Sequence, residues 1–262
     1  MGPAEVLALL GVGAAAGGAN AVVGSGSLIT FPTLLAFGFP AVLANVSNNV
    51  GMVPGNISGS YGYRRELAGQ RGRLITLGVI CAAGSVGGTI ALLTLPSAVF
   101  RFIVPVLILI ACVLVLVQPL LSKRIIARRA RRAATGDDRA AAGGEAISPV
   151  LGAGMLATAA YGGYFGASQG VLMIGLLGTF FDESLQRVNG AKNVLAAIVN
   201  GVAALVYIVF AHVDWLIVVL LGVSSTLGGL VGARYGRRLP PLALRIFIVL
   251  FGVISAVKLI FF

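Results

Sequence analysis

The chain has 262 residues, of which 58% are hydrophobic and only 10% are charged. Because a soluble globular domain is typically about 25% charged, this composition excludes an ordinary soluble domain and indicates a polytopic membrane protein. The formal net charge of +11 would suit nucleic acid, but the basic residues cluster in short loops between apolar runs. That placement predicts positive-inside topology and contact with anionic lipid headgroups, without nucleic-acid binding.

The apolar runs do not alternate with polar residues as barrel strands must, so we expect membrane helices. In chain order the segments lie at about 4–22, 27–39, 41–62, 73–95, 97–121, 148–165, 170–182, 188–211, 214–235 and 241–262. We expect residues 122–147, which are basic and rich in alanine and glycine, to form a flexible tether. The predicted units are therefore a first membrane repeat at 1–121, a linker at 122–147 and a second membrane repeat at 148–262.

The two halves of the chain resemble each other. Shifted by 144 residues, the first half aligns with the second without a gap. Glycines alone could match by chance, but the matches also include three asparagines, a Leu-Pro pair and an arginine. These polar and proline matches are Asn45 with Asn189, Asn49 with Asn193, Asn56 with Asn200, Leu95-Pro96 with Leu239-Pro240, and Arg101 with Arg245. The pattern predicts a duplicated unit, typical of secondary transporters that hold substrate where the copies meet.

The basic loops occupy different places in the two copies. In copy one the arginines lie at 64–73, and the matching loop at 211–214 has no lysine or arginine. In copy two they lie at 234–238, and the matching place at 92–96 has none. The repeats are therefore predicted to have opposite topology in the inner (plasma) membrane, with the linker cytoplasmic and both termini outside.

Two segments, 27–39 and 170–182, are short for a full span, and each follows a glycine-bearing break. Paired interrupted segments at matching positions point to a binding site. The break residues that we expect to line it are Gly24, Ser25, Gly26, Ser27, Ser168, Gln169 and Gly170. The scattered glycines elsewhere are expected to allow close helix packing.

Asn45 and Asn49 share one helix face, and Asn189 and Asn193 repeat this spacing. Asn48 accompanies the first pair, and Lys192 accompanies the second. Such side chains either bond neighbouring helices or cap them, or they line a polar site at the repeat interface. Together with the helix N-termini near Gly26 and Gly170, the second alternative gives an amide, hydroxyl and cationic lining without a carboxylate, which suits a small oxyanion.

Arg101 and Arg245 each lie one turn inside a helix that begins after a Leu-Pro pair. They either extend their charged groups toward the membrane surface or contact neighbouring helices, or they form a gate for the anion.

The acidic residues all fall at segment ends or in loops, so no mid-segment carboxylate is available for proton coupling. This favours export or facilitated flux, while sodium coupling through carbonyls and hydroxyls stays open. Cys81 and Cys112 have neither metal nor redox spacing, and no cofactor is implied.

Several motifs carry a family resemblance. In the first half they are Phe31-Pro32-Thr33-Leu34, Phe37-Gly38-Phe39-Pro40 and Ala44-Asn45-Val46-Ser47-Asn48-Asn49; in the second they are Tyr161-Gly162-Gly163-Tyr164-Phe165-Gly166 and Gly190-Ala191-Lys192-Asn193. The chain, apart from its linker, resembles the sulfite exporter TauE/SafE family. The resemblance implies transport of sulfite, organosulfonates or other small sulfur-containing anions. Ser25, Ser27, Ser168 and Gln169 stand where that family often has glycine or alanine, which would add hydrogen bonds to a larger anion.

We therefore predict an all-α polytopic transporter of two inverted repeats, each with about five helical segments, that moves a small sulfur anion by alternating access. An anion channel of the same fold and an importer coupled to an ion are the alternatives. A membrane-embedded enzyme is disfavoured because the segments lack a cluster of histidine, cysteine or carboxylate groups. A scaffold or lipid-binding subunit is a further alternative, which would be favoured if substitution of Asn49 and Asn193 left the flux unchanged.

Overall fold

The computed structural model describes residues 1–135, 147–235 and 241–261, and within these ranges the regular structure is entirely helical. The helices are α1 Pro3–Val22, α2 Ser27–Ala36, α3 Ala41–Gly62, α4 Arg71–Thr94, α5 Ser97–Thr135, α7 Pro149–Tyr164, α8 Gln169–Phe180, α9 Leu185–Phe210, α10 Trp215–Tyr235 and α11 Pro241–Phe261. The prediction of an all-α chain is confirmed for these residues.

Five of the described helices are long and apolar enough to cross a membrane by length and composition. They are α1, α4, the stretch Ser97–Ala127 of α5, α9 and α10. Helices α2 and α8 are apolar but have only 10 and 12 residues, so they are too short to cross about 30 Å of hydrocarbon. The predicted pair of short helices is thereby confirmed.

Helix α5 differs from the sequence-based expectation. The apolar segment was expected to end at residue 121 and to be followed by a flexible linker. Instead, the helix runs without interruption over 39 residues from Ser97 to Thr135. Arginine and alanine dominate the stretch after 121 and are strong helix formers, so the first part of the expected linker is helical. Residues 136–146 lie outside the described ranges.

The two halves contact each other in reciprocal pairs. Helix α1 packs on α10 and α7 packs on α4, while α3 and α9 pack on each other and also on α10 and α4 respectively. The starts of α3, α4 and α5 recur 144 residues later as the starts of α9, α10 and α11. Each half therefore completes the packing of the other.

Glycines make the reciprocal contacts close. A Cβ on Gly84 would meet the backbone carbonyl of Leu156, and a Cβ on Gly228 would meet that of Ala14. These two glycines are equivalent in the two halves, and both lie on the fourth helix of their half facing the first helix of the other. The expectation that these glycines serve close helix packing is confirmed.

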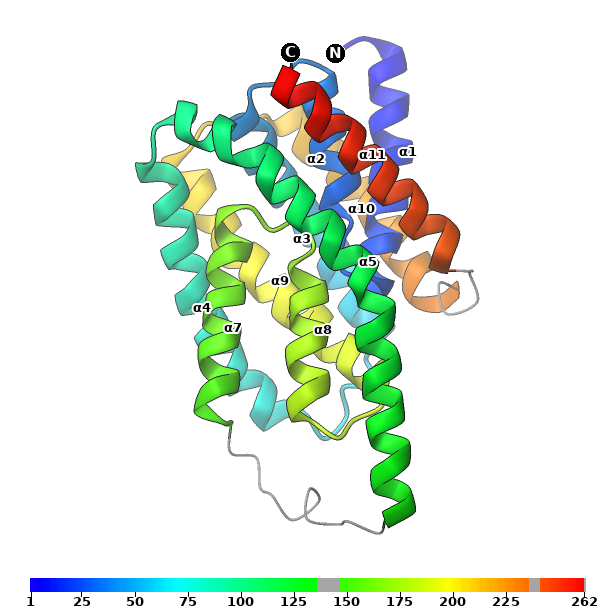
Figure 1. Ribbon diagram of the computed structural model, residues 1–262. Coiled ribbons are helices and arrows are strands. Elements are labelled where there is room, and N and C mark those ends of the chain that lie inside the picture. The colour runs from blue at the N-terminus through cyan, green and yellow to red at the C-terminus, as the bar shows by residue number, and fades with distance from the viewer. Residues whose placement is uncertain (136–146, 236–240, 262) are drawn as a thin grey trace.

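Figure 1 shows where the chain begins and ends. The N-terminus and the end of α11 lie at one end of the molecule, while α5 ends and α7 begins at the opposite end. Helix α1 starts at the first of these ends, and its counterpart α7 starts at the second.

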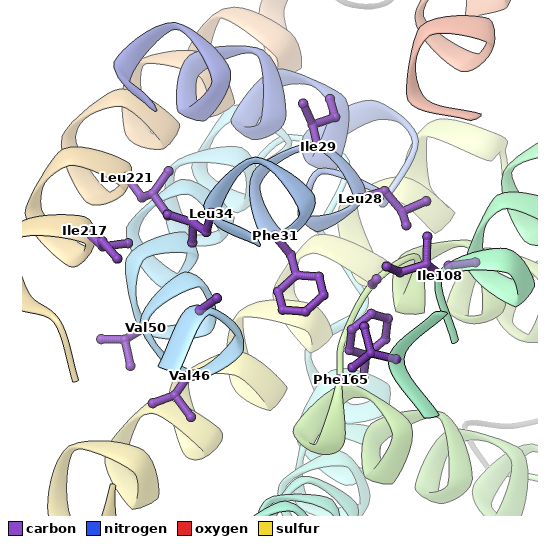
Figure 2. Packing of buried hydrophobic residues seen from close by; sticks show 14 of the residues in the cluster. Leu28, Ile29, Phe31, Leu34, Val46, Val50, Ile108, Phe165, Ile217 and Leu221 are labelled. Atoms are coloured by element: carbon purple, nitrogen blue, oxygen red, sulfur yellow. The ribbon is translucent and has the colours of Figure 1, made fainter. Parts of the chain in front are cut away.

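The apolar core surrounds α2. Phe31 and Leu34 of this helix belong to one apolar cluster with Val46 and Val50 of α3, and Phe31 lies close to Phe165 (Figure 2). Because α2 is buried on nearly all sides, it is fixed in the interior, and the chain break that precedes it lies inside the protein. Irregular backbone at this depth is tolerated only when it is surrounded by protein or lines a cavity.

Candidate functional site

Each short helix is preceded by a break with left-handed backbone. In the first break Gly24 has φ +83°, and in the second Ser168 has φ 61°. These two residues are equivalent in the duplicated pattern. The left-handed conformation costs a residue with a Cβ about 1 kcal/mol, and Ser168 adopts it while donating a hydrogen bond from Oγ to the Ala111 carbonyl over 3.3 Å. The unusual backbone is therefore common to both breaks.

The two breaks meet in the interior. A Cβ added at Gly170 would lie 2.6 Å from the Cα of Gly24, and one added at Gly24 would lie 2.7 Å from the Cα of Gly170. Contacts this short leave no room for any side chain at either position. The carbon chain of Lys192 passes next to the same point, because the Cβ at Gly170 would lie 3.0 Å from its Cδ. The centre of the molecule thus brings together both breaks and α9.

Side chains of α9 hold the end of α1. The Lys192 Nζ donates to the carbonyl of Asn20 over 2.7 Å and to that of Ala21 over 3.2 Å, and Asn193 Nδ2 donates to the Ala21 carbonyl over 3.2 Å. The last carbonyls of a helix lack partners within the helix and carry partial negative charge. The lysine therefore balances its charge against a helix C-terminus.

The other half repeats this arrangement with a weaker group. Asn45 of α3 donates from Nδ2 to the carbonyl of Tyr164, the last residue of α7, over 3.0 Å. The position equivalent to Lys192 is Asn48, so the positive charge is present on only one side of the centre. Each half thus uses its third helix to bind the end of the first helix of the other half.

A second pair of amide contacts involves four residues, of which only Gln169 was predicted for the site. Asn20 of α1 donates to Asn56 of α3, and Gln169 Nε2 of α8 donates to Asn200 Oδ1 of α9 over 2.8 Å. The signal was available, because Asn56 and Asn200 match in the 144-residue alignment. The sequence does not show that Asn56 pairs with Asn20 near the end of α1, or that Asn200 pairs with Gln169 at the second break.

Several buried polar atoms of this cluster have no hydrogen-bond partner within the described residues. They are Ser25 Oγ, Asn48 Oδ1, Asn49 Oδ1, Gln169 Oε1 and Asn189 Oδ1. Buried polar groups are normally satisfied, so unpaired ones require an explanation such as a bound molecule or water. A side-chain amide presents either its oxygen or its NH2 group after rotation by 180°, so these amides can also donate.

Aromatic rings cover one side of the second break. The Phe31 and Phe165 rings meet edge to face with centroids 5.3 Å apart (Figure 2), and Phe100 meets Tyr164 at 5.6 Å. Tyr161 donates from its hydroxyl to the Ala167 carbonyl over 2.6 Å and so fixes the break directly. The polar centre is therefore bounded by an apolar wall.

Most of the residues predicted for the site are buried, and Arg101 is not. Residues Ser25, Asn45, Asn48, Asn49, Ser168, Gln169, Asn189, Lys192 and Asn193 are between 0% and 7% exposed, Gly24, Gly26 and Gly170 are buried and Ser27 is half-buried. Arg101 of α5 is exposed instead. The side chain of Arg245 lies outside the described residues.

A family model decides the class of protein. The model for the sulfite exporter TauE/SafE family matches residues 9–259. The chain belongs to the TauE/SafE family. It is also 24% identical over 258 residues to a probable membrane transporter protein of Haemophilus influenzae, across 98% of this chain and 95% of that protein. No solved structure gives a significant match. The chain is therefore a membrane transporter of the TauE/SafE family.

In this transporter, charged residues join the two halves at the end where α5 ends and α7 begins (Figure 1). Glu183 pairs with Arg73 over 3.3 Å and with Arg187 over 2.6 Å, and Arg187 Nη1 donates to the Ala68 carbonyl over 3.0 Å. We call Arg73, Glu183 and Arg187 the linker-side ion-pair cluster. It ties the loop between α3 and α4 to the start of α9.

At the opposite end of this family member, the equivalent contacts are apolar. The positions equivalent to Glu183 and Arg73 are Phe39 and Ile217; Ile217 belongs to the apolar core cluster and Phe39 packs against it. Ser47 adds one polar contact there, because its Oγ accepts from the backbone N–H of Asp214 over 2.9 Å. Equivalent positions at the two ends of the molecule therefore make contacts of different chemistry.

Proposed function

We propose that this transporter moves a small sulfur oxyanion, such as sulfite or an organosulfonate, through the centre where the two breaks meet. The observation that carries the proposal is the contact between Gly24 and Gly170, together with the buried amides and hydroxyls of both breaks, α3 and α9 that have no partner among the described residues. In transporters, interrupted helices at the repeat interface form the substrate site. The family name supports the sulfur-anion class.

The chemistry of the centre favours an anion. Helices α2 and α8 begin at the breaks, with Ser27 and Gln169 as their first residues, and the N-terminus of a helix carries partial positive charge. Rotated amides of Asn48, Asn49 and Asn189 would present NH2 donors to an oxyanion. Lys192 contributes a positive charge from α9, and no carboxylate is among its partners in the described part of the chain.

Two inverted repeats would provide alternating access. The opposite starting ends of α1 and α7 (Figure 1) and the reciprocal helix contacts support this interpretation. The burial of the site residues is consistent with a conformation closed to both sides. Opening toward the linker would require separation of the linker-side ion-pair cluster, and opening toward the other end would separate the apolar contacts around Phe39 and Ile217.

Electrostatics favours export as the direction. A membrane potential that is negative inside assists the exit of an anion by about 2.3 kcal/mol per charge per 100 mV. An exporter therefore needs no coupling ion, whereas an importer needs one. A channel of the same fold is the second candidate, and it would conduct at rates far above those of a carrier and without saturation.

The first experiment is thermal stabilisation of the purified protein in detergent by sulfite, thiosulfate, sulfate, sulfoacetate and taurine, with acetate as control. A ligand that binds only the folded state raises the midpoint in a saturable manner. We expect a saturable shift with sulfur anions that is absent with acetate. Flux of the same anion into proteoliposomes then separates a carrier, which saturates, from a channel. Equal shifts with acetate would contradict a site selective for sulfur anions.

A further inference from the structure

A polar cavity of about 670 Å³ lies at the end of α3 and the end of α10, and its lining shares no residue with the central site. Gly62 packs tightly on Ala233 between the two helices, because a Cβ on Gly62 would collide with the methyl group of Ala233. The cavity is lined by Tyr61, Gly62, Arg64, Arg65, Glu66, Leu230, Ala233 and Arg234.

The charge of this cavity is strongly positive. Its lining residues include three arginines, Arg64, Arg65 and Arg234, and one acidic residue, Glu66. The Arg64 side chain is held in place, since its Cζ lies 4.5 Å above the Tyr61 ring and its Nη1 donates to the Tyr61 carbonyl over 3.3 Å. A stacked guanidinium keeps further N–H donors at its edge, and this fork geometry matches phosphate oxygens.

Apolar side chains lead from the cavity along both helices. On α3, Ile57 lies one turn before Tyr61, and the two are 57% and 61% exposed. On α10, Leu227 and Leu230 precede Arg234 at spacings of three to four residues and are also exposed. Residues at these spacings share one helix face. The basic cavity therefore opens onto two apolar stripes of the kind that contact lipid chains.

The fold itself does not require these arginines. The positions equivalent to Arg64, Arg65 and Arg234 in the other half are Ile208, Val209 and Ile90, which are exposed apolar residues. Equivalent helices thus form the same packing without any charge at these positions. The arginines are a feature of one end of the molecule, and a role in ligand binding accounts for their convergence on one cavity.

We propose that this cavity binds the phosphate of an anionic glycerophospholipid, with the acyl chains along the apolar stripes of α3 and α10. Basic pockets between membrane helices on the cytoplasmic side are typical sites for anionic headgroups. The proposal rests on the membrane location of the chain and is independent of the transported substrate.

The test measures lipid retention by native mass spectrometry of the full-length protein in neutral maltoside detergent. Phosphatidylglycerol, phosphatidylcholine and glycerol phosphate are titrated separately. The test variant is the double substitution R64Q/R234Q, and the matched control is K123Q/R124Q, which removes two exposed charges from α5. The thermal midpoint of each variant without lipid shows that it is folded.

We expect saturable binding of one phosphatidylglycerol per chain, about 30-fold weaker in R64Q/R234Q and nearly unchanged in K123Q/R124Q. A second variant, R64K/R234K, keeps the charge but loses the fork and should bind with intermediate strength. Equal binding by R64Q/R234Q and K123Q/R124Q, or equal retention of phosphatidylcholine, would overturn the proposal. If glycerol phosphate bound as tightly as phosphatidylglycerol, the cavity would be a site for free phosphate esters and the lipid assignment would be wrong.

Discussion

Gly24 and Gly170 meet backbone to backbone at the centre of the molecule, each leaving less than 3 Å for a Cβ on the other. The two residues belong to different halves of the chain and to different helix breaks. Their contact places the irregular backbone of both halves at one point, where neither a bulky side chain nor a continuous helix could fit. Movement of one half relative to the other must therefore alter the surroundings of this contact.

Gly170→Ala is predicted to impair the transporter. The new Cβ would lie 2.6 Å from the Gly24 Cα and 3.0 Å from the Lys192 Cδ, so the breaks must separate. Overpacking of this kind costs about 1–3 kcal/mol, which should lower both the thermal midpoint in detergent and anion flux in proteoliposomes. Gly201→Ala is the control, because a Cβ there has nothing within 4 Å. Equal behaviour of the two variants would show that the contact is dispensable.

Asn49→Ala and Asn193→Ala are predicted to weaken anion binding by about tenfold or more, as expected for a lost hydrogen bond to a charged ligand. Their effects on stability should differ. Asn193 donates to the Ala21 carbonyl, so its loss should cost about 1 kcal/mol. Asn49 Oδ1 has no partner among the described residues, so its loss should cost less.

Titration of the anion followed by thermal unfolding separates these two effects. Thr76→Ala serves as control, because that hydroxyl is exposed on α4 and bonds within its own helix. Normal anion binding by both asparagine variants would mean that these amides are packing elements and that the site lies elsewhere.

The sequence predicted the helix breaks and the buried amides but not how they are connected. Glycine and serine at 23–27 and 165–170 predict irregular backbone through their local conformational preferences. Because the two halves resemble each other, the same signal occurs at equivalent positions in both. The bond from Lys192 to the Asn20 carbonyl joins residues 172 positions apart, so it depends on how α9 lies against α1. The extension of α5 to Thr135 was missed because charge and small residues suggested a tether, although their helix propensity is high.

Lys192→Met is predicted to reduce stability and anion affinity together. Methionine has a similar volume but donates nothing, so the carbonyls of Asn20 and Ala21 lose their charged donor. Hydrogen bonds to a charged group contribute about 1.5–3 kcal/mol each, and loss of the positive charge removes attraction for the anion. The exposed Lys123→Met is the control for loss of charge alone.

Thermal midpoints and anion titrations distinguish the two roles of Lys192. A lower midpoint with unchanged affinity in the folded fraction would assign Lys192 to the helix end alone. If neither quantity changed, the two contacts of Lys192 with backbone carbonyls would contribute nothing measurable to stability or binding, and both roles assigned to Lys192 would be wrong.

Glu183→Gln is predicted to open the transporter toward the linker side more often. Glu183 joins Arg73 and Arg187 across the two halves, and half-exposed ion pairs contribute about 0.2–1 kcal/mol each. A reporter cysteine at Ser25, in a chain with Cys81 and Cys112 replaced by alanine, should therefore react about two- to fivefold faster with an impermeant maleimide in inside-out vesicles. High salt should act in the same direction on the unsubstituted cluster, because salt screens exposed charges.

Glu5→Gln is the control, because it removes a carboxylate near the N-terminus, at the opposite end (Figure 1), and should leave the labelling rate unchanged. Slower labelling in Glu183→Gln would instead show that the cluster holds an open state, and the assignment of this end as a closed gate would then be wrong.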